Sequence, residues 1–424
     1  MDAMAARASR AAWAHQCRAR ARHRAAWARS AATLAAPFRT RTDEVPGREP
    51  LLFTPGPLTT SPAVKMAMQV DLGSRDTLFM QVIKDVRNGL LAMAGVSQAE
   101  GYECVIVQGS GTFAVEATVS SVVPKQGGKL LVLSNGAYGK RMAEIAGIHG
   151  IPVSIRHYGE REAPRPEHAV EELQNDPSIT HVGCIHHETT TGALNPIEAI
   201  GKAIHAKSPK VSFIVDSMSG FGCYPVDMKV GHIDYLVSSS NKCIEAVPGF
   251  AYAVARREAL EASKGNARTL SLDLLAQWHV LEATGQFRFT PPTHTLLAFR
   301  QALREHEAEG GQRGRLARYQ HNFNVLREGM AKMGFHPYLD DDIQGCIITT
   351  YMFPTDPKFD FPRLYKSLQD RGIVIYPGKL TEAECFRIGT IGRLFEADMR
   401  FLLTAFKDIM EEMGVQLPVT QLSL

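Results

Sequence analysis

The chain has 424 residues, of which 45% are hydrophobic and 21% charged, and its formal net charge is +3. These values are ordinary for a globular protein, and they exclude a collagen-like repeat, a chain disordered throughout and a small disulfide scaffold. The seven cysteines are scattered without a C-x-x-C pair, which indicates reduced thiols in an intracellular protein and no zinc ribbon. No run of eighteen apolar residues occurs, so we expect no transmembrane helix.

Positive charge is concentrated at the N-terminus. Residues 1–50 hold ten arginines and four acidic residues, a local charge of +6 that leaves −3 for the other 374 residues. Such an Arg- and Ala-rich segment is typical of mitochondrial targeting peptides, and GC-rich DNA translated from a wrong start codon would look the same. We therefore treat residues 1–49 as a disordered or cleaved leader of a cytoplasmic or mitochondrial protein. We expect no nucleic-acid or membrane partner, because the segment has no lysine and few aromatic residues for stacking.

From Leu51 onward, short β-branched runs alternate with helical patterns. The candidate strands are Cys104–Val107, Lys129–Leu133, His181–Ile185, Val211–Val215, Tyr235–Ser238 and Phe250–Ala255. Several are apolar on both faces, as central parallel strands are. The helical patterns between them include Phe113–Val122, Ala137–Ile148 and Glu167–Gln174. This order predicts an α/β fold in which a mostly parallel sheet lies between layers of helices.

The pattern of apolar residues changes after Pro292. A helical pattern runs from Leu296 to about Met333 with an interruption at Gly310–Gly311, and it predicts a second, smaller α/β domain. The elements expected after it are strands at Cys346–Met352, Ile373–Tyr376 and Phe386–Ile388 and a helix at Glu396–Met413. We set the boundaries at residues 65–295 for the large domain and 296–424 for the small one, with an N-terminal segment, residues 50–64, packing against the small domain.

A glycine-rich turn follows the first predicted strand. In Gln108-Gly109-Ser110-Gly111-Thr112 the glycines permit a tight turn, and the helix that begins there offers free N–H groups suited to a phosphate. Gly109-x-Gly111-x-x-Ala114 also fits the dinucleotide fingerprint of a nicotinamide-dependent dehydrogenase. That interpretation requires an acidic residue after the next strand, where Ser134-Asn135 stand. A turn that binds no ligand stays open as a third possibility.

Two ionisable residues stand at predicted strand ends. Asp216 closes its strand, where α/β folds bind ligands, although it could also cap the next helix. Lys242 follows the next strand, 26 residues later, among hydroxyl groups. A partly desolvated lysine has the lowered pKa that Schiff-base formation needs. Ser239-x-x-Lys242 also matches serine–lysine hydrolases, but the accompanying S-D-N and K-T-G motifs are absent, and a solvated surface lysine stays possible.

Three further features are candidates for the site. Arg387 lies in an apolar strand, where its guanidinium could hold a carboxylate or phosphonate or form a structural ion pair. Tyr138 could stack on a cofactor ring or be a packed loop residue. His186-His187-Glu188 lacks a metal-ligand spacing, so we expect no metal site.

In this order, the features are what a pyridoxal phosphate enzyme needs. A cup holds the phosphate, an aspartate keeps the pyridine nitrogen protonated, a lysine binds the cofactor and transfers a proton, and an arginine orients an anionic substrate.

Eight longer runs carry a family resemblance. They are Leu52-Phe53-Thr54-Pro55-Gly56-Pro57-Leu58-Thr59-Thr60, Gln108-Gly109-Ser110-Gly111, Ser134-Asn135-Gly136-Ala137-Tyr138-Gly139, Glu188-Thr189-Thr190-Thr191-Gly192, Ser240-Asn241-Lys242-Cys243, Pro292-Thr293-His294-Thr295, Ile375-Tyr376-Pro377-Gly378-Lys379 and Cys385-Phe386-Arg387-Ile388-Gly389. Between Leu51 and Gly414 the chain resembles the class V, fold-type I pyridoxal phosphate aminotransferases. The leader has no counterpart in this family.

The resemblance implies a role for each matching residue. Lys242 would be the Schiff-base lysine and general base, Asp216 the pyridinium partner, and Arg387 the substrate-binding cation. The other implied cofactor contacts are Gly109, Ser110, Gly111 and Thr112 at the phosphate, Tyr138 on the ring, Thr190 near the phenolic oxygen, Asn241 where some relatives have Gln, and Thr295 at the phosphate of the other subunit of a homodimer.

The resemblance also implies substrates. The Thr59-Thr60 extension and the last two runs are more specific to family members that transfer the amino group of 2-aminoethylphosphonate to pyruvate, which yields phosphonoacetaldehyde and L-alanine in phosphonate degradation. An alanine–glyoxylate or serine–pyruvate activity is the alternative within the family.

Overall fold

The computed structural model describes residues 49–380 and 384–420. The described residues from Pro50 onward form one compact unit. The predicted leader lies outside the described residues except for Glu49, so its interpretation stays a prediction. Within the described part of the chain, no helix combines the length and the apolar character needed to cross a membrane.

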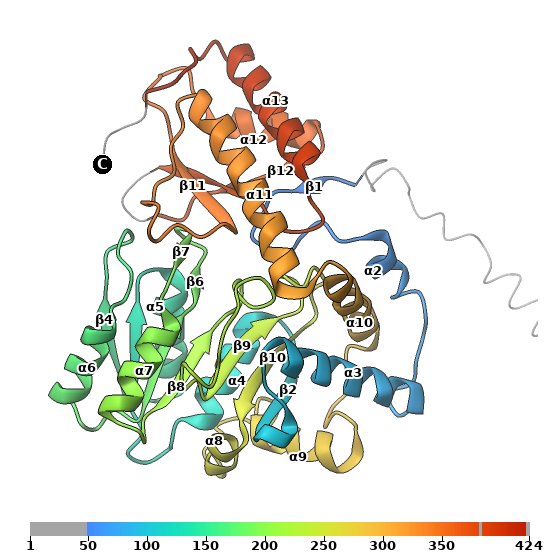
Figure 1. The fold of residues 1–424 in the computed structure, drawn as a ribbon, viewed down its shortest axis with the longest axis vertical. Helices are drawn as coiled ribbons and strands as arrows, with labels where there is room; N and C mark the ends of the chain where they lie inside the picture. The colour runs from blue at the N-terminus through green and yellow to red at the C-terminus, as the bar shows by residue number, and fades with distance from the viewer. Residues whose placement is uncertain (1–48, 381–383, 421–424) are drawn as a thin grey trace, which may run out of the picture. The chain divides into compact units, whose positions relative to one another are not determined.

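A seven-stranded sheet is the centre of the described structure (Figure 1). Its strands are β2 (Tyr102–Gln108), β3 (Leu130–Ser134), β4 (Val153–His157), β5 (His181–Ile185), β8 (Ser212–Asp216), β9 (Tyr235–Ser239) and β10 (Phe250–Arg256). They lie in the order β2-β10-β9-β8-β5-β3-β4. From β9 to β4 all neighbours are parallel, and only β10 runs antiparallel to its two neighbours. The predicted α/β fold with a mostly parallel sheet is therefore confirmed.

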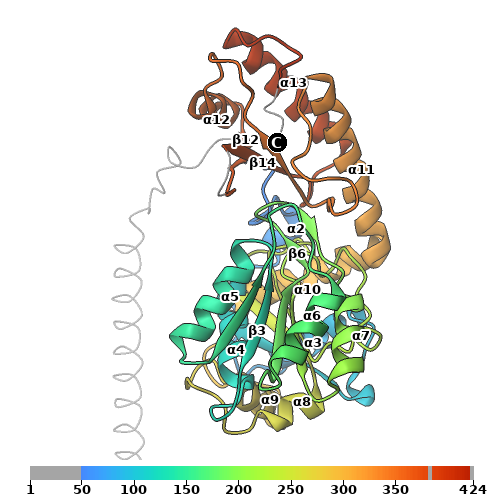
Figure 2. The same cartoon turned by 90° about the vertical axis from the view of Figure 1, so that its left-hand side faces the viewer.

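Helices cover both faces of this sheet, because alternate strand residues point to opposite sides. Ile214 belongs to the core on one face and Val215 to the core on the other. The first face is covered by α4 (Gly111–Val122), α5 (Ala137–Ile148), α8 (Arg257–Ala262) and α9 (Leu274–Thr284). The second is covered by α3 (Thr77–Met93), α6 (Pro166–Asn175), α7 (Ile197–Lys207) and α10 (Thr293–Ala308). Figure 2 shows α4 and α5 on one side of the sheet and α6 and α7 on the other.

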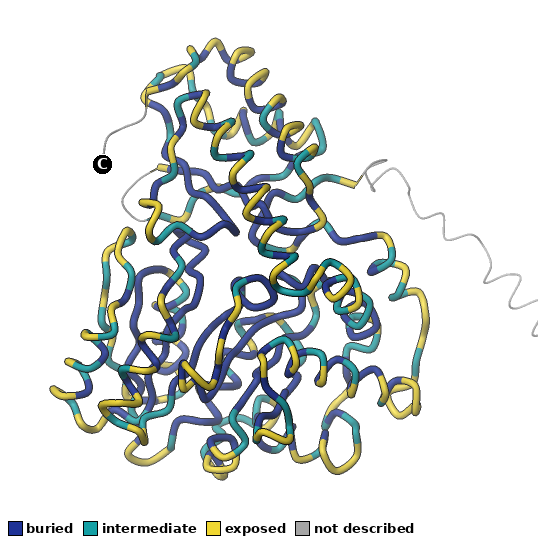
Figure 3. The backbone as a smooth tube through the Cα atoms, viewed as in Figure 1, coloured by how far each residue is buried: buried dark blue, intermediate teal, exposed yellow. Residues whose placement is uncertain are grey.

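A smaller sheet lies in the C-terminal part of the chain. It contains β11 (Ile348–Met352), β13 (Tyr376–Pro377) and β14 (Cys385–Gly389), with β14 antiparallel to both neighbours. The apolar residues that pack with it come from α11 (Gly311–Lys332), α12 (Phe361–Asp370) and α13 (Glu396–Glu412). Figure 3 shows the strands of both sheets mostly buried and the outer faces of the helices exposed.

Short elements complete the fold. They are β1 (Leu51–Leu52), α2 (Pro62–Met66), the 3₁₀ turn η2 (Gln98–Glu100), β6 (His187–Glu188), β7 (Ala193–Leu194) and β12 (Ile373–Val374). β1 pairs in parallel with β12, and β6 pairs with β7. The predicted strand Ile373–Tyr376 is thus two strands, because residues 373–374 pair with β1 whereas Tyr376 pairs with Arg387.

The long helical pattern is divided at the predicted glycines. Gly310 and Gly311 have φ values of +100° and +66°, a left-handed conformation that few other residues adopt. α10, before them, buries apolar residues in the core of the large sheet, whereas α11, after them, packs in the C-terminal core. The division into domains at residue 296 stays a prediction.

Candidate active site

A cavity lies at the carboxyl ends of β5 and β8, beside the N-termini of α4 and α5. Its polar lining includes Thr112, Tyr138, Arg141, Thr189, Asp216 and Lys242. The rest of the lining comes from Val115 of α4, Met142 and Ile145 of α5, Ile185 of β5, His187, and Met218 and Ser219 of the loop after β8. Four of the residues that the sequence assigned to one site, namely Thr112, Tyr138, Asp216 and Lys242, therefore face the same cavity.

Asp216 is a buried carboxylate without a cationic hydrogen-bond partner among the described residues. It ends β8, and its Oδ1 accepts a 2.9 Å hydrogen bond from the backbone N–H of Met218. Burial raises the pKa of Asp216 to about 7, and the nearby Glu188 carboxylate acts in the same direction. A buried carboxylate of this kind is stabilised by a cationic N–H group.

Lys242 follows β9 and lies within reach of the N-terminal segment. Its Nζ donates a 2.7 Å hydrogen bond to the carbonyl of Pro55. Gly56 has a φ of +117°, and a Cβ at that position would lie 2.7 Å from Nζ. Burial lowers the pKa of Lys242 to about 8, so a larger fraction of this amine is neutral and nucleophilic at physiological pH than for a solvated lysine.

The glycine-rich turn forms a cradle at the start of α4. Gly109 has a φ of +109°, which favours glycine, and a Cβ on Gly111 would overlap the Sδ of Met218 unless that side chain moved. Ser110 precedes the helix without capping it through its side chain. Because the first N–H groups of a helix have no intrahelical partner, those that follow Ser110 can bind an anion.

Glu188 connects two of the predicted residues. Its Oε2 accepts a 3.1 Å hydrogen bond from the N–H of Tyr138, and its Oε1 accepts a 2.6 Å bond from the hydroxyl of Thr190. Thr190 is therefore turned toward Glu188, and its neighbour Thr189 lines the cavity. The Arg141 guanidinium lies 5.1 Å from the centre of the Tyr138 ring. The sequence had suggested no role for Arg141, although its position one helical turn after Tyr138 was a usable signal.

Arg387 is a buried guanidinium bound by backbone carbonyls. Its Nη1 donates to the carbonyl of Thr189 at 2.8 Å, and its Nε donates to the carbonyl of Pro377 at 3.1 Å. Within the described residues no carboxylate forms an ion pair with it, which leaves the structural ion-pair alternative without a partner. Arg387 is not itself among the residues that line the cavity, but it bonds to Thr189, which is, and it has hydrogen-bonding capacity left for an anion.

Asn241 and Thr295 do not line the cavity. The Oδ1 of Asn241 accepts a 3.1 Å hydrogen bond from the hydroxyl of Ser239. Thr295 lies beside Gly249, whose carbonyl accepts a 3.0 Å bond from the N–H of Gly109. Thr295 is thus close to the outer side of the cradle, and its predicted contact with another subunit remains a prediction.

A family model described as "Aminotransferase class-V" matches residues 66–383. The chain belongs to the class V aminotransferases. Membership of this family decides against the nicotinamide dehydrogenase and the serine–lysine hydrolase that the sequence left open. The protein is a pyridoxal phosphate-dependent transaminase.

The relatives extend over nearly the whole described chain. A 2-aminoethylphosphonate–pyruvate transaminase of Syntrophobacter fumaroxidans is 48% identical over 365 residues, which cover 86% of this chain and 97% of the relative. The enzyme of that name from Klebsiella pneumoniae is 48% identical over 367 residues, with 86% and 98% coverage.

Solved structures agree with the fold. The pyridoxamine–pyruvate aminotransferase of Mesorhizobium loti has a TM-score of 0.78 at 25% identity, covering 87% of this chain and 94% of that one. The ureidoglycine–glyoxylate aminotransferase of Bacillus subtilis has a TM-score of 0.80 at 22% identity, with 88% and 96% coverage.

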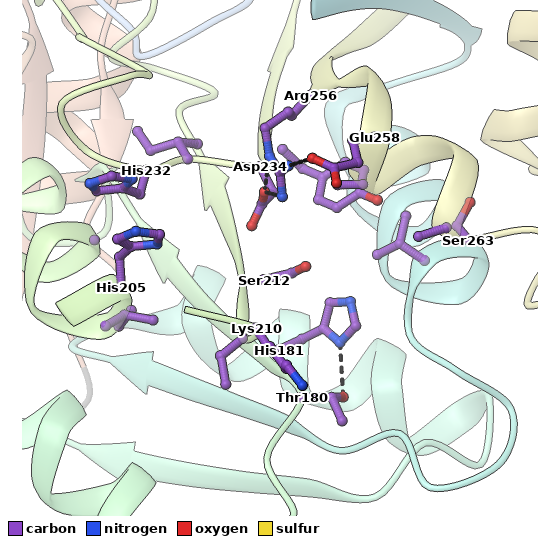
Figure 4. Close-up of a pocket in the computed structure, with 18 of the residues that line it drawn as sticks. Thr180, His181, His205, Lys210, Ser212, His232, Asp234, Arg256, Glu258 and Ser263 are labelled. Carbon is purple, nitrogen blue, oxygen red and sulfur yellow. Dashed lines mark hydrogen bonds and ion pairs between the residues drawn. The ribbon is translucent and has the colours of Figure 1, made fainter. Parts of the chain in front are cut away.

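A second pocket lies at the amino-terminal ends of the strands of the large sheet, where β5 and β8 begin, and thus opposite the first cavity (Figure 4). Its principal charged groups are already paired: Arg256 binds Asp234 at 2.7 Å and Glu258 at 2.5 Å. His181 is buried and contacts the Thr180 hydroxyl at 2.9 Å. This pocket lacks the free helix N-terminus and the unpaired buried carboxylate of the first, so the first is our candidate active site.

The His186-His187-Glu188 run lies beside the active site. Burial lowers the pKa of His186 to about 4 and that of His187 to about 3, so both rings are neutral at physiological pH. No group of three or more His, Cys, Asp or Glu side chains is arranged for a metal ion among the described residues.

The raised pKa of Asp216 predicts how the cofactor-free protein responds to pH. Between about pH 4 and 7 the unfolded chain has lost the carboxyl proton that the folded chain retains, so ionisation of Asp216 lowers the free energy of unfolding as pH rises through this range, relative to a variant without this proton. Asp216→Asn keeps the acceptor for Met218 but has no proton to lose. At pH 8 it should exceed the wild-type free energy of unfolding by up to about 4 kcal/mol. Urea denaturation at pH 5 and pH 8 measures the difference.

Asp234→Asn is the matched control, because Asp234 is equally buried but is paired with Arg256. It should destabilise the protein at pH 8. An Asp216→Asn protein less stable than wild type at that pH would contradict the raised pKa of Asp216.

Proposed function

We propose that this transaminase moves the amino group of 2-aminoethylphosphonate to pyruvate, giving phosphonoacetaldehyde and L-alanine, with pyridoxal 5′-phosphate held by the residues of the cavity. The observation that carries the proposal is that relatives matching over nearly their whole length bear this activity in their names. A buried arginine without an ion pair among the described residues, next to a cavity that contains a lysine of lowered pKa, supports it.

The cavity residues fit the proposed cofactor. The amine of Lys242 would hold it covalently, the carboxylate of Asp216 would accept the pyridine N–H, and the cradle at Gly109–Thr112 would bind the phosphate. The bound cofactor supplies an electron sink that lets a proton leave the amine-bearing carbon of the substrate.

Lys242 is the proposed proton carrier. An amine whose pKa lies near 8 can accept a proton and return it at physiological pH, whereas an ordinary lysine stays protonated. Its hydrogen bond to Pro55 holds Nζ toward the N-terminal segment. Asp216 ends β8 and Lys242 follows the adjacent parallel strand β9, which puts both groups at the carboxyl ends of the strands.

Arg387 is the proposed anchor for both substrates. The phosphonate of the amine donor and the carboxylate of pyruvate are anions at slightly different distances from the reacting carbon. The two hydrogen bonds to backbone carbonyls fix the guanidinium plane and leave further N–H groups for either anion.

Arg387→Gln should therefore lower kcat/KM for both substrates by about a hundredfold, the scale of a lost buried charged hydrogen bond. Steady-state kinetics with each substrate varied in turn measures the effect. Arg393→Gln, at an exposed position six residues later, should leave kcat/KM within twofold of wild type. A loss confined to one substrate would contradict a shared anion site.

A second copy of the chain is the proposed cover for the cradle. Phe113 and Phe289 are 52% and 43% exposed, and the ring of Phe113 lies against Gly109. The side chain of Gln108 donates a 2.5 Å hydrogen bond to the carbonyl of Thr290, which brings the segment before Thr295 to the same place. Exposed aromatic residues beside a binding site are typical of an interface.

Light scattering after gel filtration should give twice the mass of one chain for the wild type. Phe113→Asp should give the mass of a single chain, because a buried unpaired carboxylate opposes association. Ile148→Asp, at a residue 75% exposed, should remain dimeric. A monomeric wild type would refute the proposed homodimer.

One experiment tests the function directly. The purified protein should show the visible absorbance of a lysine-bound cofactor, and addition of 2-aminoethylphosphonate should remove it until pyruvate restores it. Lys242→Ala should lack this band, because the covalent link is lost. Alanine formed faster from serine than from 2-aminoethylphosphonate, or glyoxylate preferred to pyruvate, would identify the other class V activity.

A further inference from the structure

A buried ion cluster lies directly behind Lys242. Its centre is Glu245, which is 3% exposed and stands three residues after the lysine. Its Oε1 accepts hydrogen bonds from Arg318 at 2.7 Å and from the hydroxyl of Tyr319 at 2.5 Å. Arg315 lies 3.4 Å from the same oxygen and is 1% exposed. All three partners belong to α11.

The cluster holds the turn that follows Lys242. Glu245 has a φ of +61°, a conformation that residues other than glycine seldom adopt, and its N–H donates a 2.7 Å bond to the carbonyl of Lys242. Arg315 donates to the carbonyl of Cys243 through the same Nη1 that faces Glu245. The sparsely populated backbone conformation persists because the surrounding groups hold it from both sides.

The same cluster reaches the strand that contains Arg387. Nη1 of Arg318 donates to the carbonyls of Gly392 and Leu394 at 2.6 and 3.0 Å, and the Tyr319 hydroxyl accepts a 3.2 Å bond from the N–H of Gly392. Gly392 lies three residues after the end of β14. α11 therefore connects the lysine turn to the arginine strand through charged side chains on one face.

We propose that Glu245 is a positioning residue, which through Arg315, Arg318 and Tyr319 fixes the turn that aims Lys242 and ties that turn to the segment after β14. The inference rests on the proposed function in taking Lys242 as the residue that binds the cofactor. Glu245 acts through the backbone, without contact to a reacting group.

The chain contains a matched cluster that separates positioning from stability. Glu103 is 1% exposed and is also bound by two arginines, Arg87 at 3.2 Å and Arg257 at 2.6 Å. It lies near the start of β2, far along the strand from the cradle. Removal of one partner from a buried ion cluster is destabilising in either place, so only a positioning role makes the two sites differ in kinetics.

The test compares Glu245→Gln with Glu103→Gln. Glu245→Gln should lower kcat about tenfold with KM changed less than twofold, the pattern expected when a reacting amine is misplaced but substrate binding is kept. It should also slow the rate at which the cofactor-free protein regains visible absorbance when pyridoxal phosphate is added. Glu103→Gln should lower the unfolding midpoint while leaving kcat and this rate unchanged. Wild-type kcat and recapture rate in Glu245→Gln, or equal losses in both variants, would overturn the proposal.

Tyr319→Phe is the second variant, for the case that Glu245→Gln does not fold. It removes one donor to Glu245 and leaves every charge in place, so it should lower kcat and the recapture rate in the same direction but by less. Wild-type values for Tyr319→Phe would overturn the role of the cluster. Because recapture is measured without any amine substrate, it separates this inference from failure of the proposed substrate assignment.

Discussion

Burial of two opposite charges at one edge of the sheet is the constraint on which the site depends. Asp216 ends β8 and Lys242 follows the adjacent parallel strand β9; removal from water disfavours the charged form of each, which raises the pKa of Asp216 and lowers the pKa of Lys242. Apolar residues from several parts of the chain exclude water from the two side chains. The apolar cluster that contains Cys243 also contains residues of the N-terminal segment and of α11, so distant parts of the chain close over the lysine turn.

Most of the large sheet could be predicted from the sequence because its strands are buried on both faces and stand out as apolar runs. β4 was missed for the opposite reason: it lies at the sheet edge, and its residues are half-buried or exposed. The antiparallel direction of β10 was not predicted, although the short segment between β9 and β10, which contains no helix, favours an antiparallel neighbour.

The sequence predicted the site residues whose charged side chains are unusual at their positions. It did not predict the backbone groups that hold those side chains in place. Asp216 and Arg387 are conspicuous because charged side chains in apolar surroundings need a reason, and Lys242 because it follows a predicted strand among hydroxyl groups. The groups that orient them are carbonyls: Pro55 for Lys242, 187 residues away, and Thr189 for Arg387, 198 residues away. Every residue has a backbone carbonyl, so the sequence does not mark which one is the hydrogen-bond partner, and only the structure identifies it. Glu245 shows the intermediate case, a charged residue whose proximity to the lysine in sequence was visible but whose three partners on α11 were not.

The pairing of β1 with β12 has a consequence for how the chain is made. Leu51 pairs with Ile373, so 322 residues must be synthesised before the first strand can find its neighbour. At a translation rate of about 5–20 residues per second, that interval is roughly 20–60 seconds. The segment that supplies the Pro55 carbonyl is thus among the first to leave the ribosome and among the last to be fixed. Until then, the large sheet can assemble around Asp216 while the amine of Lys242 still lacks the partner that holds it in place.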